Sequence, residues 1–112
     1  MKIPRRISLL LVIGAALVMG SISQQAAEKP DGGETFRANC AMCHGVDGKG
    51  FTALKTPDFT SAKWQASVKD SQILDTIKHG KKGTPMPAFS SRLSEKEILA
   101  VLRQVRAFGK KK

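Results

Sequence analysis

Apolar side chains recur at helical spacing in three segments of the chain, which are separated by polar, glycine-rich stretches. The middle segment, residues 70–79, places Ile73, Leu74 and Ile77 on one stripe of a helix. Gly80 follows directly, and glycine commonly occupies the position after the last helical residue. This pattern predicts an amphipathic helix over residues 70–79.

The last segment gives the clearest helix. Ser94 and Glu97 have the spacing of a capping box, in which each side chain accepts a hydrogen bond from the backbone N–H of the other residue. Gly109 predicts the end of this helix. Its expected apolar face consists of Ile98, Leu99, Val101, Leu102, Val105 and Phe108.

The first segment, "DGGETFRANCAMC", predicts a shorter helix that begins near Asp31 or Gly32. Glu34 lies three residues after Asp31, which is close to a capping-box arrangement. Phe36 and Cys40 are four residues apart, so they share one face of the predicted helix.

Between these helices the sequence predicts irregular backbone. Glycines and a proline interrupt residues 45–57, and residues 58–67 continue this loop with a single turn at most. Residues 80–91 form a second loop, whose backbone is restricted by Pro85 and Pro87. No segment alternates between apolar and polar positions as a strand does. We therefore expect an all-α domain with long loops.

The N-terminal part has the order of an export signal, with a basic start, an apolar stretch and then small polar residues. Its uncharged run, residues 7–22, is shorter than the roughly 18 to 20 residues that span a bilayer comfortably. We expect cleavage after Ser23, with an uncleaved inner-membrane anchor as the alternative, and a domain that is periplasmic or otherwise exported. The expected organisation is a signal peptide at 1–23, a flexible lead-in at 24–30, the folded domain at 31–109 and a basic tail at 110–112.

The chain is strongly basic. Its formal net charge of +10 falls to +7 when residues 1–23 are removed. A basic exported protein meets little nucleic acid, and the sequence contains no nucleic-acid-binding motif, so we expect no nucleic-acid partner. The positive charge instead favours acidic protein partners, and the basic tail favours contact with an anionic membrane surface.

The only two cysteines, Cys40 and Cys43, occur in the motif "CAMCH", with His44 directly after the second. A thioredoxin-like dithiol requires strands and a helix N-terminus, which the sequence lacks here. A zinc site could combine these three residues with His79, but it leaves the loop around Met86 unexplained. A disulfide suits an exported protein but leaves His44 without a role. Covalent haem attachment uses both thiols and makes His44 the proximal iron ligand.

Elimination indicates the distal ligand. Once residues 1–23 are removed, Met42 and Met86 are the only methionines, and Met42 lies inside the attachment motif. Met86 lies between two prolines in a stiff loop that can reach the opposite side of a haem. His79 ends a predicted helix, where a cationic ring interacts favourably with the helix dipole. We therefore expect iron bound by His44 and Met86, with a bis-histidine site as the alternative.

The segments "GGETFRANCAMCHGVDGKG", "TPDFTSAKW", "IKHGKKGTPMPAF" and "LSEKEILAVLRQVRAFGK" resemble the class I c-type cytochromes, which are small bacterial proteins with one haem. The resemblance covers residues 31–109. It implies a cytochrome c fold, with about three to five helices around one covalently attached haem, and first and last helices that cross. It also implies that Gly32 and Phe36 pack against the last helix, where Gln104 replaces the usual aromatic residue.

The same resemblance implies two further contacts. The carbonyl of Pro57 is expected to accept a hydrogen bond from the Nδ1–H of His44, and Trp64 is expected to contact a haem propionate. The apolar walls of the haem site are expected to include Phe51, Phe59, Leu74, Ile77 and Phe89.

Two occupied axial positions favour a monomeric single-electron carrier over an enzyme, because the iron then has no open position for a substrate. The alternatives are a haem enzyme or sensor in which Met86 is labile, and a cytochrome subunit of a larger respiratory complex. Acidic redox proteins are the expected partners, steered by the lysines of the two loops, namely Lys49, Lys55, Lys78, Lys81 and Lys82.

Overall fold

The computed structural model describes Lys2, Gly14 and residues 29–110. Most of the predicted export signal, most of the lead-in and the last two residues of the basic tail therefore lie outside the described residues. Those predictions stay predictions. Within the described part, no helix is both long enough and apolar enough to cross a membrane.

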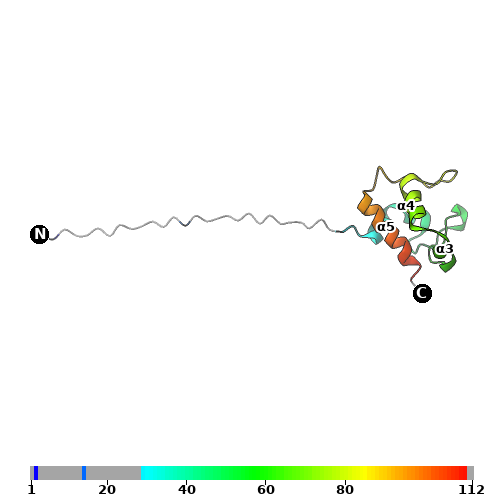
Figure 1. Ribbon diagram of the computed structural model, residues 1–112, viewed down its shortest axis with the longest axis horizontal. Coiled ribbons are helices and arrows are strands. Elements are labelled where there is room, and N and C mark those ends of the chain that lie inside the picture. Colours follow the sequence, from blue (N-terminus) through cyan, green and yellow to red (C-terminus); the bar gives the residue numbers. More distant parts are fainter. Residues whose placement is uncertain (1, 3–13, 15–28, 111–112) are drawn as a thin grey trace.

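All regular structure in residues 29–110 is helical, as the sequence predicted (Figure 1). Five α-helices and one short 3-10 helix follow one another along this part of the chain. They are α1 (Gly32–Asn39), α2 (Ala41–His44), η1 (Thr52–Leu54), α3 (Ala62–Ser67), α4 (Asp70–His79) and α5 (Glu95–Phe108).

The first and last helices pack directly against each other. A Cβ added to Gly32 would lie 2.2 Å from the carbonyl oxygen of Ala100. The two backbones therefore approach more closely here than a residue with a side chain at position 32 would allow. One helical turn further on, the ring of Phe36 meets the ring of Phe108 edge-on, with centroids 5.0 Å apart. Phe36 is 1% exposed, and it lies at the centre of the core. The expected crossing of the two helices is therefore confirmed.

Helix α4 packs on α5 in the same core. Its buried residues, Ile73 and Ile77, belong to the predicted stripe. The capping box of α5 also forms as predicted, because Ser94 Oγ accepts from the N–H of Glu97 and the Glu97 carboxylate accepts from the N–H of Ser94. Leu99 is 41% exposed, whereas the other residues of the expected apolar face are buried.

The structure differs from the sequence prediction over residues 58–67. Where at most one turn was expected, α3 forms a helix of six residues. Ser61 begins it, and its side chain accepts a hydrogen bond from the N–H of Trp64 at 3.2 Å. A serine cap of this kind is a recognisable start signal, but the segment has no apolar stripe to accompany it.

Candidate haem site

Cys40, Cys43 and His44 lie on a single helical turn. Helix α1 ends at Asn39, α2 begins at Ala41, and Cys40 is the single residue between them. The N–H groups of Cys43 and His44 both donate to the carbonyl oxygen of Cys40, at 3.1 and 2.9 Å. Cys40 is buried and Cys43 is exposed, and both are free thiols. The disulfide alternative is therefore not formed in this structure.

The environment of Cys40 is unfavourable for a reactive thiolate. Burial, and to a smaller extent the neighbouring Cys43, raise the pKa of Cys40 from its ordinary 9.0 to about 11. Catalytic dithiols require the opposite shift, because the thiolate is their nucleophile. A stable bond through sulfur suits this position better than thiol exchange.

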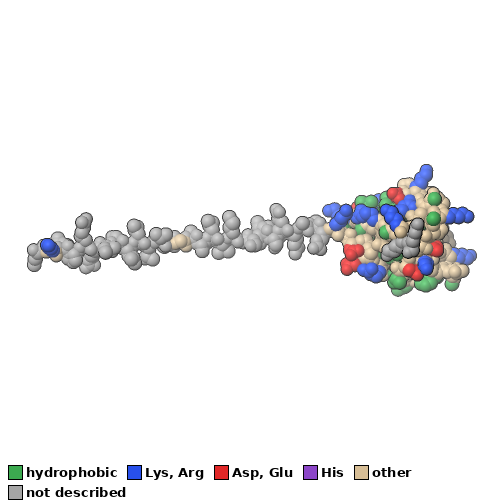
Figure 2. All heavy atoms as spheres, turned by 90° about the horizontal axis from the view of Figure 1, so that it is seen from below, with side chains coloured by type: hydrophobic (Ala, Val, Ile, Leu, Met, Phe, Trp, Pro, Cys, Tyr) green, Lys and Arg blue, Asp and Glu red, His purple; other side chains and the backbone are tan. Residues whose placement is uncertain are grey.

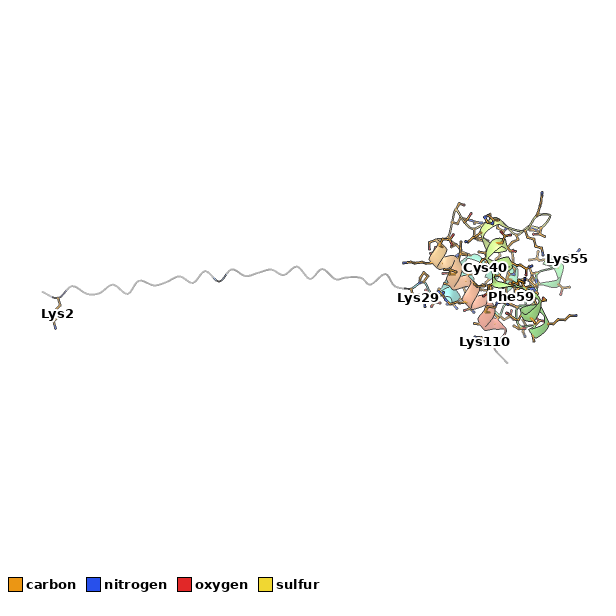
Figure 3. All side chains as sticks on the ribbon, in the orientation of Figure 1. Lys2, Lys29, Cys40, Lys55, Phe59 and Lys110 are labelled. Carbon is orange, nitrogen blue, oxygen red and sulfur yellow. The ribbon has the colours of Figure 1, made fainter. Side chains whose placement is uncertain are left out.

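Aromatic rings hold the imidazole of His44. Its ring stacks on Phe59, with a centroid distance of 4.9 Å and an interplanar angle of 19°. On its other side Phe59 packs against Trp64, at 4.8 Å and 48°. Figure 3 shows Phe59 and Cys40 within the body of the domain. Burial lowers the pKa of His44, so the imidazole is neutral at neutral pH, which is the form that binds a metal.

The Nδ1 atom of His44 is buried and has no hydrogen-bond partner in the described structure. The bond to the carbonyl of Pro57 that the resemblance implied is not present in this structure, and it stays a prediction for the haem-bound protein. The carbonyl of Pro57 instead lies against Gly50, where an added Cβ would be only 2.7 Å away. In this structure the ring of His44 is in contact with the ring of Phe59.

Met86 belongs to a loop that closes back on itself. The N–H of Lys81 donates to the carbonyl oxygen of Met86 at 3.2 Å, and the N–H of Met86 lies 3.3 Å from Thr84 Oγ1. Gly80 has a φ of 74°, and a Cβ there would meet the Met86 carbonyl oxygen at 2.7 Å. The side chain of Met86 is half-buried and packs against the hydrophobic core.

The other expected wall residues differ in their burial. Phe59, Ile77 and Phe89 are buried, and Leu74 and Trp64 are partly buried against the same core. The guanidinium of Arg92 lies over the ring of Phe89, 4.6 Å from the ring centroid. Phe51 is 46% exposed, so it is not a buried wall residue in this structure.

His79 makes its contacts away from the turn that contains Cys40, Cys43 and His44, which we call the attachment turn. It ends α4, its side chain is exposed, and its Nδ1 is paired with Asp75 at 2.9 Å. In residues 29–110 no group of three or more His, Cys, Asp or Glu side chains is placed to hold a metal ion. The zinc site that includes His79 is therefore not assembled, and this arrangement also disfavours the bis-histidine alternative.

The donor set fits a covalently attached haem. Two unpaired thiols and a neutral imidazole occupy one turn, and the imidazole lies among aromatic rings with one buried nitrogen unpaired.

Gln65 and Arg106 also reach this region through a hydrogen-bond network that was not predicted from the sequence. Their signal is weak, because each is a single polar residue in a short helix or near a helix end.

This fold and donor set place the chain among the c-type cytochromes, which carry haem c bound covalently. More particularly, residues 27–103 match the family model described as cytochrome c oxidase, cbb3-type, subunit III. The chain belongs to that family, and the predicted fold class and cofactor are confirmed.

Relatives and a solved structure agree with this assignment. The cbb3-type cytochrome c oxidase subunit FixP of Azorhizobium caulinodans is 40% identical over 84 residues, which are 75% of this chain and 28% of FixP. The subunit CcoP of Cereibacter sphaeroides is 31% identical over 98 residues, covering 88% of this chain and 33% of CcoP. The chain thus spans about a third or less of these relatives. The solved KustC0563 c-type cytochrome is 33% identical with a TM-score of 0.66, over 70% of this chain and 98% of that chain.

Proposed function

We propose that this protein is a single-electron carrier in which Cys40 and Cys43 bind one haem through thioether bonds, His44 is the proximal iron ligand and Met86 is the distal ligand. When bound, the haem supplies one-electron exchange at its iron. The observation that carries the proposal is the turn in which two free thiols directly precede a neutral, ring-packed imidazole.

The residues of the chain determine how such a group behaves. A thioether from Met86 is a softer ligand than a second imidazole, so it favours a higher reduction potential. The buried side chains of Phe59, Ile77 and Phe89 exclude water, which acts in the same direction. With both His44 and Met86 holding the iron, the haem would supply one-electron exchange and would not bind oxygen or peroxide. This arrangement suits a carrier and not an oxidase or peroxidase centre.

Positive charge on the surface supports an acidic redox partner. On the face seen in Figure 2, Lys and Arg side chains occur on all sides of the domain, and Asp and Glu occur at fewer places. Lys49, Lys55, Lys81 and Lys82 are exposed in the two loops beside the attachment turn and Met86. Lys78 differs, because it is paired with Glu95 at 3.0 Å and is less available to a partner. Association steered by these lysines weakens with added salt.

Membership in the oxidase family favours a second candidate function. The relatives are named as cbb3-type cytochrome c oxidase subunits, so this chain would pass electrons within such a complex. Fractionation of cells separates the two, since a subunit stays with the membrane-bound oxidase and a periplasmic carrier is released with the periplasmic contents.

The ligand assignment is tested by changing Met86 to Ala in protein made by cells that attach haem. We expect ferric Met86→Ala protein to become high-spin, to lose the sulfur-to-iron charge-transfer band and to bind added cyanide or azide readily. Met42→Ala is the matched control, because Met42 is 89% exposed and should leave the spectrum unchanged. A low-spin Met86→Ala spectrum identical to that of the unaltered protein would show that another residue is the distal ligand. A pyridine assay for thioether-linked haem tests Cys40 and Cys43 in the same samples.

A further inference from the structure

We propose that Gln65 and Arg106 are positioning residues that set the orientation of the His44 ring, acting through Phe59. The inference rests on the proposed role of His44 as an iron ligand, and it adds a role for two residues far from the attachment motif in the sequence. Three steps connect them, from α5 to α3, from α3 to the backbone of Phe59, and from the ring of Phe59 to the imidazole.

The side chain of Gln65 joins the segment before α3 to helix α5. Its Nε2 donates to the carbonyl oxygen of Phe59 at 2.7 Å and to that of Val105 at 2.9 Å. One amide group thus binds two backbone segments that are separated by 46 residues in sequence. Gly109 leaves room for this side chain, since a Cβ there would lie 2.6 Å from Gln65 Cγ.

Arg106 fixes the amide of Gln65 from the other side. Its Nη1 donates to both the Oε1 and the backbone oxygen of Gln65, each at 2.9 Å. Its Nη2 donates to the carbonyl of Val68 at 2.6 Å, and its Nε donates to Asp70 at 2.7 Å. The planar guanidinium can satisfy all four acceptors at once, and a lysine ammonium lacks this geometry. With its oxygen held by Arg106, the amide can only direct its nitrogen toward Phe59.

Phe59 transmits this constraint to His44. Its N–H donates to the carbonyl oxygen of Gly48 at 2.8 Å, and its own carbonyl is held by Gln65, so its backbone is fixed on both sides. Its ring contacts those of both Trp64 and His44. Metal-binding histidines are usually oriented by a hydrogen bond to their second ring nitrogen. In the described structure His44 Nδ1 has no such bond, and the ring that stacks on the imidazole is that of Phe59.

The hydrogen bonds of Gln65 and Arg106 lie at the edge of the domain, so these residues can be substituted without leaving a sealed cavity in the core. A pocket of about 400 Å³ opens beside them and is lined by Gln65, Asp70, Arg106, Gly109 and Lys110. Shortening a side chain here leaves space that water can enter, and it does not create a sealed apolar cavity.

The test compares haem-loaded Gln65→Leu and Arg106→Lys proteins with the unaltered protein. Arg103→Lys is the matched control, because Arg103 is exposed on the same helix. The readouts are the electron paramagnetic resonance g-values and the hyperfine-shifted haem methyl resonances of the ferric protein, which depend on the plane of the axial imidazole. We expect both variants to shift these signals and Arg103→Lys to leave them unchanged. Lost hydrogen bonds should also lower the thermal midpoint by roughly 5–15 °C.

A double variant separates positioning from general stabilisation. If Gln65 acts through Phe59, the Gln65→Leu/Phe59→Leu protein should show the same spectroscopic shift as Phe59→Leu alone. A lowered thermal midpoint with unchanged g-values and methyl resonances would overturn the inference, and so would additive shifts in the double variant. If Gln65→Leu does not fold, Arg106→Lys carries the same comparison. The Met86→Ala spectrum tests iron ligation independently, so unchanged signals in an otherwise low-spin protein would refute only the positioning role.

Discussion

Replacing Gly32 by Ala tests the packing that joins the two ends of the domain. The new Cβ would lie 2.2 Å from the carbonyl oxygen of Ala100 and 2.8 Å from its carbonyl carbon. Real Cβ atoms essentially never lie closer than 3.0 Å to such atoms, so α1 and α5 must separate by about 0.8 Å. The obstructing atoms belong to the backbone of a helix, so no side-chain rotation can relieve the contact.

The expected cost follows from that displacement. A gap of 0.5–1 Å already forfeits about a quarter to a half of the dispersion energy of a contact. The separation would affect the contact between Phe36 and Phe108, whose centroids are now 5.0 Å apart. Overpacking of this kind costs about 1–3 kcal/mol in free energy of unfolding. For a domain of this size, such a loss lowers the thermal midpoint by about 5–20 °C.

Gly33→Ala provides the matched control. Gly33 is the next residue of α1, so both substitutions change helix propensity at the same end of one helix. A Cβ at Gly33 would meet only side-chain atoms, the nearest being Asp31 Oδ1 at 3.2 Å. Thermal unfolding of the haem-loaded proteins, followed by far-ultraviolet circular dichroism, should show a large loss for Gly32→Ala and little change for Gly33→Ala. Equal midpoints for the two variants would show that the close approach of the backbones has no energetic importance.

Two further predictions concern local hydrogen bonds. Ser94→Ala removes the acceptor for the Glu97 N–H and should cost about 0.5–2 kcal/mol in a denaturant titration; an unchanged unfolding midpoint would contradict the role of this cap. The pKa of Asp58 lies below its ordinary 3.8, chiefly because Thr60 donates from its side chain and its backbone, with a smaller effect from Lys49. The stabilising contribution of Asp58 is therefore complete above that ordinary value and is lost as the pH falls through the lower folded-state pKa. Thr60→Val should raise this pKa in an NMR titration more than Lys49→Gln does, and the reverse order would refute the stated cause.

The sequence predicted those elements whose signals are local. Helix α4 carries its own apolar stripe and is followed by Gly80, and α5 carries its own capping box. Helix α3 lacks such a stripe. Its position depends on bonds from Gln65 to Val105 and from Arg106 to Gln65, which link residues about 40 positions apart. No periodicity within residues 58–67 could have indicated them.

In the candidate site, too, the sequence predicted the features with local signals and not those that depend on distant residues. The turn proposed to bind the haem could be predicted because Cys40, Cys43 and His44 lie within five consecutive residues, and this spacing is typical of covalent haem attachment. The environment of His44 could not be read in this way. Its ring stacks on Phe59, fifteen residues later, and its Nδ1 has no hydrogen-bond partner in the described structure. The conformation of the loop between His44 and Phe59 determines which group faces the imidazole. The sequence of this loop is compatible with several backbone conformations.

The crossing of α1 and α5 gives the ends of this domain an unusual importance. Chain ends are commonly the first parts to fray, and they tolerate truncation or tagging when little is packed on them. Here the first and the last helix each supply a ring to the same buried contact, and the attachment turn follows α1 directly. Loosening either end should therefore open the whole domain cooperatively. An affinity tag or a shortened C-terminus that disturbs Phe108 should therefore also disturb the turn that contains Cys40 and Cys43, although these cysteines lie far from Phe108 in the sequence.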